Sequence, residues 1–139
     1  MIFKNILIIS SLCATVILRG AVHEKIHEHG SPTPPHEIVQ GFVNGDAKLI
    51  SKHFNMSVEL IFSESSGTYS KSHAEQIVRT FFNNNTSGTG RFNYKHLHGS
   101  DRDNVQYYIG ELHTGKGLYR VTIHMKDKLI HRMRIESND

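Results

Sequence analysis

Four strand-like runs in the last third of the chain leave few choices of fold. They span residues 91–98, 104–113, 117–126 and 128–136, and apolar and polar residues alternate along them. Alternation with period two and short connections is typical of antiparallel strands joined as a meander. One face of such a sheet is apolar and must be covered, so the sequence predicts helices packed against it.

Apolar residues at helical spacing before the meander can supply that cover. One stripe spans residues 38–43 and is broken by Asn44 and Gly45. Asp46 is placed to cap a second short helix that carries Leu49, Ile50 and Phe54. A strand is expected at residues 58–62 and a short extended piece at Thr68 and Tyr69, followed by a helix with an apolar stripe over 74–82. Early helices, one helix between early strands and a late meander predict an α+β fold.

The stretch GTYSKSHAEQIVRTFF, residues 67–82, places hydroxyls, a lysine and a histidine side by side. They could form a nucleophile with its base, or they could mark the start of a helix. Ser72 lies three residues before Glu75, which is the spacing of a capping box. We therefore interpret these side chains as the N-terminal cap of a helix and assign no catalytic residue among them.

Loop lengths decide which residues of the meander share a face. A three-residue loop at 126–128 would pair Ile123 with His131, and the same test around 114–116 would pair Glu111 with Tyr119 and Tyr107 with Ile123. This register predicts that His131 lies on the apolar face. The opposite face would then carry Tyr108, Arg120, Thr122, His124, Arg132 and Arg134. A solvated surface, a site for an anionic partner and a subunit interface are the alternatives for these arginines.

Several segments resemble one known protein family. They are IVQGFVNGDAKLISKHFNMSVEL, GTYSKSHAEQIVRTFF, QYYIGELHTGKGLYRV and RMRIE, within residues 36–136. The family consists of small exported proteins of Gram-negative bacteria with a domain-of-unknown-function label, in the nuclear transport factor 2-like superfamily. The resemblance implies a cone, in which a curved antiparallel sheet wraps around a long helix and leaves a cavity at the open end. That superfamily includes isomerases, dehydratases, polyketide cyclases and pure binding or dimerising modules, and fold does not choose among them.

A histidine on an apolar face needs a hydrogen-bond partner or water. His131 is therefore either a satisfied core residue or part of a ligand pocket at the mouth of the cone. The candidate ligand-binding residues are Tyr94, His96, Tyr107, Glu111, Tyr119 and His131. Aromatic walls with few polar groups are typical of small-molecule pockets. Glu111 and His131 could also act as acid and base, whereas a structural module would fill its cone with Phe81, Phe82 and Phe92.

The N-terminus has the layout of a secretory signal peptide, with Lys4 before an apolar run over residues 6–18. We expect a signal peptide at 1–21, a disordered linker at 22–35 and one domain at 36–137; an uncleaved anchor is the alternative. Lys4 and Arg19 would leave with the leader, so 16 basic residues become 14 against 13 acidic ones. That balance does not support nucleic-acid binding. Cys13 would leave too, which excludes disulfides and thiolate chemistry.

Histidines and glutamates alternate in the expected linker, where His23, His27 and His29 could hold a divalent metal. A free tail gives such a site no supporting contacts, so only adventitious binding is expected, and we predict no metal site and no cofactor. The sequence thus favours an exported, non-enzymatic module in the periplasm or outside the cell. It would be a monomer or homodimer that binds a small apolar or amphipathic ligand or a protein partner, without a membrane span. The alternatives are an isomerase, dehydratase or cyclase using a His/Glu/Tyr pocket, and an interaction subunit using the outer sheet face.

Overall fold

The computed structural model describes residues 30–63, 65–86, 88 and 90–138. Its elements are α1 His36–Asn44, α2 Ala47–Ser51, β1 Phe54–Phe62, β2 Ser65–Ser70, α3 Lys71–Asn85, β3 Asn93–Arg102, β4 Val105–Thr114, β5 Gly117–Lys126 and β6 Leu129–Ser137. The predicted helices, early strands and four-stranded meander are present, except that α2 ends at Ser51 and Phe54, which was expected on that helix, begins β1. The expected α+β class is therefore confirmed. The expected signal peptide and most of the expected linker lie outside the described residues.

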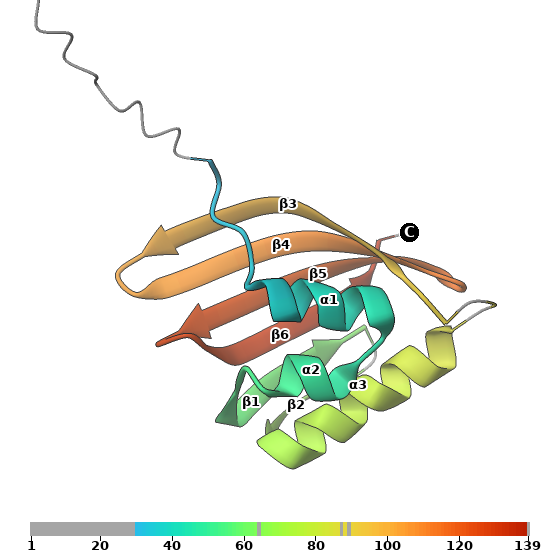
Figure 1. Ribbon diagram of the computed structural model, residues 1–139. Coiled ribbons are helices and arrows are strands. Elements are labelled where there is room, and N and C mark those ends of the chain that lie inside the picture. Colours follow the sequence, from blue (N-terminus) through green and yellow to red (C-terminus); the bar gives the residue numbers. More distant parts are fainter. Residues whose placement is uncertain (1–29, 64, 87, 89, 139) are drawn as a thin grey trace, which may run out of the picture.

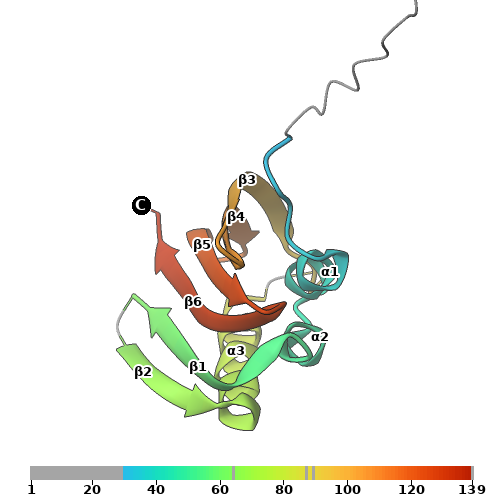
Figure 2. The same cartoon turned by 90° about the vertical axis from the view of Figure 1, so that its left-hand side faces the viewer.

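The strands form one six-stranded sheet in the order β2-β1-β6-β5-β4-β3. Neighbouring strands are antiparallel except β1 and β6, which run parallel and join the first hairpin to the meander. The sheet curves around the helices, as Figures 1 and 2 show. At one end α1 lies against β3, and at the other α3 lies against β1 and β2. Within the part of the chain that is described, no helix is long and apolar enough to cross a bilayer.

The hydrophobic core fills the space between the concave face of the sheet and the helices. Phe42 of α1 is fully buried, stacked on Tyr94 of β3 at 5.2 Å between ring centroids and edge-on to Phe82 of α3 at 6.1 Å. Phe82 in turn packs against Phe92 at 5.3 Å. These contacts join α1 and α3 to the sheet, because each helix presents its apolar stripe to the same volume.

The start of α3 confirms part of the prediction and corrects part of it. Ser70, not Ser72, is the N-cap residue, and its Oγ accepts a hydrogen bond from the backbone N–H of His73 at 3.4 Å. The hydroxyl-rich stretch thus caps the start of a helix as predicted, but the proposed capping box of Ser72 with Glu75 is wrong. The helix begins two residues earlier than predicted, because Ser70 ends β2 in extended backbone and also serves as the N-cap of α3.

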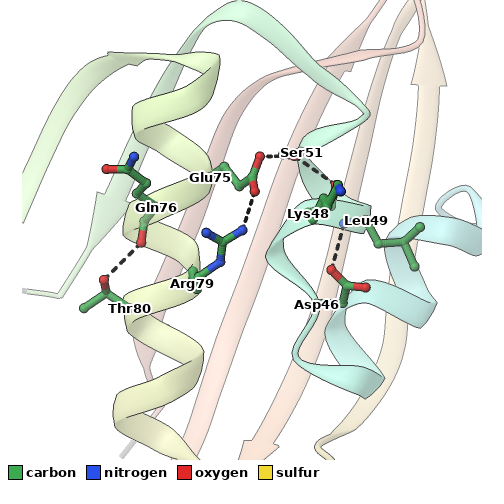
Figure 3. A network of polar contacts seen from close by, with 8 residues as sticks. All are labelled: Asp46, Lys48, Leu49, Ser51, Glu75, Gln76, Arg79 and Thr80. Carbon is green, nitrogen blue, oxygen red and sulfur yellow. Dashed lines mark hydrogen bonds and ion pairs between the residues drawn. The ribbon is translucent and has the colours of Figure 1, made fainter.

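Glu75 instead ties α3 to α2 (Figure 3). Its carboxylate accepts a hydrogen bond from the buried hydroxyl of Ser51 at 2.9 Å and pairs with Arg79 one turn further on. Figure 3 also shows the predicted cap of α2, where Asp46 accepts the backbone N–H of Leu49 at 3.0 Å. A carboxylate held between two helices in this way fixes their spacing beside the core.

The register expected between β4 and β5 is wrong by one residue. The strands are joined through Gly115 and Lys116, which pairs Tyr108 with Ile123 and Glu111 with Arg120. Tyr108, Gly110 and Leu112 therefore face the core, whereas Tyr107, Ile109 and Glu111 face outward. A glycine can face the core here because the ring of Tyr94 occupies the space where its side chain would lie, with Cζ 2.6 Å from the position of a Cβ.

The predicted loop between β5 and β6 is also wrong. The turn has two residues, Asp127 and Lys128, with φ of 51° and 65°, and it pairs Lys126 with Leu129. Backbone with positive φ at both positions is the type I′ geometry that suits two-residue hairpins. A bulge between the 124–132 and 125–130 pairs leaves His131 as the extra residue, so His131 does not pair with Ile123. Beyond the bulge, Met133 and Ile135 face the core as predicted.

The last residues of the expected linker pack on the domain. Ser31 Oγ accepts the backbone N–H of Gly99 at 2.6 Å and donates to the Gly99 carbonyl at 2.9 Å, and Pro34 is buried. Figure 1 shows this segment crossing β3 on its way to α1. Only a glycine allows the approach, because a Cβ at position 99 would lie 1.9 Å from the Pro32 carbonyl oxygen. The segment therefore covers part of the edge strand.

Candidate functional site

The predicted ligand-binding residues do not form one site. Tyr94 and His96 face the core side of β3, Tyr107 and Glu111 lie on the outer face of β4, and His131 lies in the bulge of β6. The sixth, Tyr119, faces inward near the start of β5. The predicted common pocket is therefore wrong. It depended on a β4–β5 register that is shifted by one residue, and on a pairing of His131 with Ile123 that the turn and bulge between β5 and β6 prevent.

Glu111 and His131 cannot act together as acid and base. Glu111 sits on β4 opposite Arg120, and its carboxylate lies 3.8 Å from the imidazole of His113. His131 lies two strands away, where it lines an outer depression with Glu59 and Lys126. The two groups lie apart on different strands of the sheet, so the predicted acid–base pair is not formed.

Tyr94 and His96 pack in the core layer beside α1. Burial raises the pKa of Tyr94 to about 12, since the phenolate would lose its hydration. The Tyr94 hydroxyl and both ring nitrogens of His96 are enclosed without a hydrogen-bond partner among the described residues. The His96 ring instead contacts Tyr108, with 6.3 Å between ring centroids. These two residues thus serve packing between α1 and the sheet.

A pocket of about 490 Å³ opens between α3, the start of β5 and the ends of β1 and β6. The described lining combines apolar walls with hydroxyl and amide side chains: Phe62, Ser63, Ser65, Ile77, Thr80, Phe81, Asn84, Asn85, Tyr119, Ile135 and Ser137. Pockets of this size and mixture are the usual sites for small molecules.

The helical period of α3 divides its apolar residues between the core and this pocket. Ala74, Val78 and Phe82 point into the core and are buried, whereas Ile77 and Phe81 face the pocket. The Phe81 ring lies 5.5 Å from that of Phe62 and 5.1 Å, edge-on, from that of Tyr119. Of the three phenylalanines expected to fill the cone, Phe82 and Phe92 do so and Phe81 forms a wall of the open part.

Hydrogen bonds hold Tyr119 in the wall of the pocket. Its hydroxyl donates to Oδ1 of Asn85 at 2.9 Å, and Nδ2 of Asn85 donates to the Phe81 carbonyl at 2.8 Å. Asn85 is 6 % exposed. The amide therefore links the end of α3 to β5 and orients a tyrosine of the pocket wall.

The described lining of this pocket carries no carboxylate, imidazole, ammonium or guanidinium group. Among the described residues that line it, Tyr119 alone has an ionisable side chain, a phenol. Such a lining favours uncharged ligands with an apolar body, because a buried charge would find no counter-charge. Of the six predicted ligand-binding residues, only Tyr119 lines this pocket. The sequence did contain a signal for two others: Ile77 and Phe81 have i, i+4 spacing and lie on the edge of the apolar stripe of the helix.

The outer face of the sheet carries most of the residues that were expected there. Arg120, Thr122, His124, Arg132 and Arg134 share the outer face, but Tyr108 is buried on the inner one. Among the described residues, no group of three or more histidine, cysteine, aspartate or glutamate side chains is placed to hold a metal ion. The linker histidines His23, His27 and His29 lie outside those residues.

Comparison with solved structures identifies the fold. A DUF4783 family protein from Bacteroides ovatus is 29 % identical, with a TM-score of 0.68, covering 79 % of this chain and 99 % of that one. A DUF4783 family protein from Bacteroides uniformis is also 29 % identical, with a TM-score of 0.67 over 77 % and 99 % of the chains. A nuclear transport factor 2-like protein of unknown function from Cytophaga hutchinsonii has 9 % identity and a TM-score of 0.53, covering 73 % and 84 %.

The family comparison covers nearly the whole domain. The model of the family described as "Domain of unknown function (DUF4783)" matches residues 35–137. Among curated proteins, none is significantly similar to the chain. The chain belongs to the DUF4783 family and has a nuclear transport factor 2-like α+β fold.

Proposed function

We propose that this protein is a non-enzymatic binding module that holds a small, uncharged, apolar or amphipathic ligand in the pocket beside α3. The observation that carries the proposal is the described lining of that pocket. Aromatic and aliphatic walls from Phe62, Ile77, Phe81 and Ile135 surround a space of about 490 Å³, and hydroxyl and amide groups lie among them. An apolar body would gain free energy by leaving water, and the polar groups would orient its polar end.

The same lining argues against the alternative of an isomerase, dehydratase or cyclase. Those reactions move protons and need a base or acid whose pKa lies near the working pH. The described walls offer only the phenol of Tyr119, and its proton is already donated to Asn85. Glu111 and His131, the pair considered for such chemistry, lie elsewhere on the molecule. Binding is therefore the function that the pocket supports best.

Substitution of Asn84 tests the pocket with a matched control. Asn83 and Asn84 are adjacent exposed residues of α3, and only Asn84 lines the pocket. N-phenyl-1-naphthylamine, a neutral apolar fluorophore, is expected to bind the parent protein saturably at one site. In Asn84→Trp the indole would occupy the pocket and weaken binding by about tenfold or more, whereas Asn83→Trp should bind like the parent protein.

Fluorescence titration measures the affinity of each variant for the probe, and circular dichroism shows that each variant is folded. Equal affinities for Asn84→Trp and Asn83→Trp would place the probe elsewhere and contradict the proposal. A signal that rises without saturation, in the parent protein, would do the same because it would report only diffuse surface adsorption.

We also propose that the module works outside the cytoplasm. The support is the N-terminal pattern of Lys4 followed by an apolar run at residues 6–18. N-terminal sequencing of the protein recovered from cells tests this, and a mature chain beginning close to residue 22 is expected. Recovery of the chain with Met1 still in place, in the soluble cytoplasmic fraction, would contradict export.

A further inference from the structure

A second pocket lies on the opposite, outer face of the sheet. It encloses about 220 Å³ and crosses β4, β5 and β6. Its described lining consists of Tyr107, Thr122, His124, Arg132 and Arg134. None of these described lining residues carries a carboxylate, although Glu59 and Glu136 lie beside the two arginines. Two guanidinium groups, an imidazole and a hydroxyl around one small space form a set of hydrogen-bond donors.

The register of the sheet brings these residues together from three strands. Tyr107 pairs with His124, which pairs with Arg132, and Thr122 pairs with Arg134 in the next row of the same face. The Tyr107 and His124 rings are 4.5 Å apart between centroids and form one wall. Thr122 lines the pocket and is only 8 % exposed, so we place its side chain at the floor. The pocket is thus built on paired strands rather than on mobile loops.

Neighbouring carboxylates position the two guanidinium groups without using all of their donors. Arg132 Nε donates to Glu59 on β1, and Arg134 Nη1 lies 3.5 Å from Glu136. A guanidinium has five N–H donors in a planar fork, and these contacts engage one nitrogen of each. Each arginine therefore keeps donors that a planar or tetrahedral oxyanion could accept, and its ion pair limits the freedom of its side chain.

The surroundings of His124 report the electrostatics of this pocket. Burial lowers the pKa of His124, Arg132 and Arg134 lower it further, and Glu59 partly opposes them. Tyr107 faces the ring from β4, while Arg120 and Lys126 share its strand and outer face. His131 lies in the adjoining depression. The imidazole is therefore neutral at pH 7 and sits in a positive potential that an anion would relieve.

We propose that this outer pocket binds a compact oxyanion, of the phosphate or the carboxylate type, between the guanidinium groups of Arg132 and Arg134. The Thr122 hydroxyl donates to the anion from the floor. Charge-assisted hydrogen bonds from arginine are stronger than neutral ones and suit both anion geometries. The site is separate from the apolar pocket beside α3, because the two lie on opposite faces of the sheet.

Anion binding and protonation of His124 are expected to reinforce each other. A bound anion favours the charged imidazole and so raises the pKa of His124. By linkage, affinity must increase as the pH falls through the lowered pKa of this group, below the ordinary value of about 6.5. At pH 7.5 the imidazole stays neutral and only the two guanidinium groups attract the anion.

The experiment follows the imidazole resonances of the full domain by NMR during titration with sodium sulfate, sodium acetate and sodium chloride at matched ionic strength. Sulfate keeps its charge over pH 5.5–7.5 and stands for a phosphate group, while acetate stands for a carboxylate. His124→Gln identifies the His124 signal by its disappearance. We expect sulfate or acetate, but not chloride, to shift that signal saturably, to raise the pKa of His124 and to bind more tightly at pH 5.5. The preferred anion identifies the ligand type.

Two exposed arginines on the same face give a matched pair. Arg134→Gln removes a donor of the pocket and should weaken binding by about tenfold. Arg120→Gln removes the same charge from a position outside the lining and should change affinity by less than about twofold. Equal losses in the two variants would overturn the proposal in favour of diffuse attraction. So would an unchanged His124 pKa in the unmodified protein, a measurement that does not depend on any variant folding.

Discussion

Replacement of Phe42 by alanine is expected to lower the free energy of unfolding by about 3–5 kcal/mol. Phe42 is 0 % exposed and lies where α1, α3 and β3 meet. Its ring is stacked on Tyr94 and edge-on to Phe82, so truncation leaves a cavity lined by rings that cannot all move inward. Urea unfolding followed by circular dichroism measures the loss.

Met56→Ala is the control for this prediction. Met56 is a large apolar residue on β1 that is 82 % exposed. Its truncation therefore shortens an apolar side chain that lies in water and leaves the core unchanged. Its effect should stay within about 0.5 kcal/mol. If Phe42→Ala cost no more than Met56→Ala, the position of α1 over the concave face of the sheet would be wrong.

Replacement of Gly45 by alanine is expected to cost about 2–4 kcal/mol. Gly45 ends α1 with a φ of 62°, which an L-residue adopts only at a cost. An added Cβ would also lie 2.6 Å from Cε2 of Phe92, a buried ring packed against Phe82. The conformational cost and the displacement of this ring therefore add. Thermal and urea unfolding both report the loss.

Gly88→Ala separates these two causes. Gly88 has a φ of 63°, nearly that of Gly45, but apart from its own chain neighbours no described residue lies within 4 Å of the position of its Cβ. Only the conformational cost, about 1 kcal/mol, is then expected. The difference between the two variants measures the contact with Phe92. Equal losses would show that the core tolerates a methyl group there, contrary to the packing described.

The helices and strands were predictable because their signals are local. The stripe at 38–43 ends at Gly45, Asp46 caps α2, and alternation marks the four late strands. These patterns depend on residues within one or two turns of each other, and each predicts its element without knowledge of the rest of the chain. The α+β class follows from their order.

The candidate site was predictable only in small part. Adjacent tyrosines at 107 and 108, and an apolar Ile109 beside Gly110, make both faces of β4 equally plausible from sequence. Tyr108 and Gly110 face inward because the ring of Tyr94 covers Gly110, which is a contact between different strands. The bulge at His131 likewise reverses parity within β6. Tyr119 was placed correctly because the alternation of β5 has no such ambiguity.

Local periodicity was thus sufficient to define which segments are helical or extended and in what order they occur. Which side chains face the core or the solvent, and with them both pockets, depends on the exact lengths of two turns and on a one-residue bulge. Side chains alternate with period two, so one extra residue moves a whole strand's side chains from core to solvent. The free energy that selects between these registers comes from packing against other elements, and a sequence pattern within one strand does not contain it.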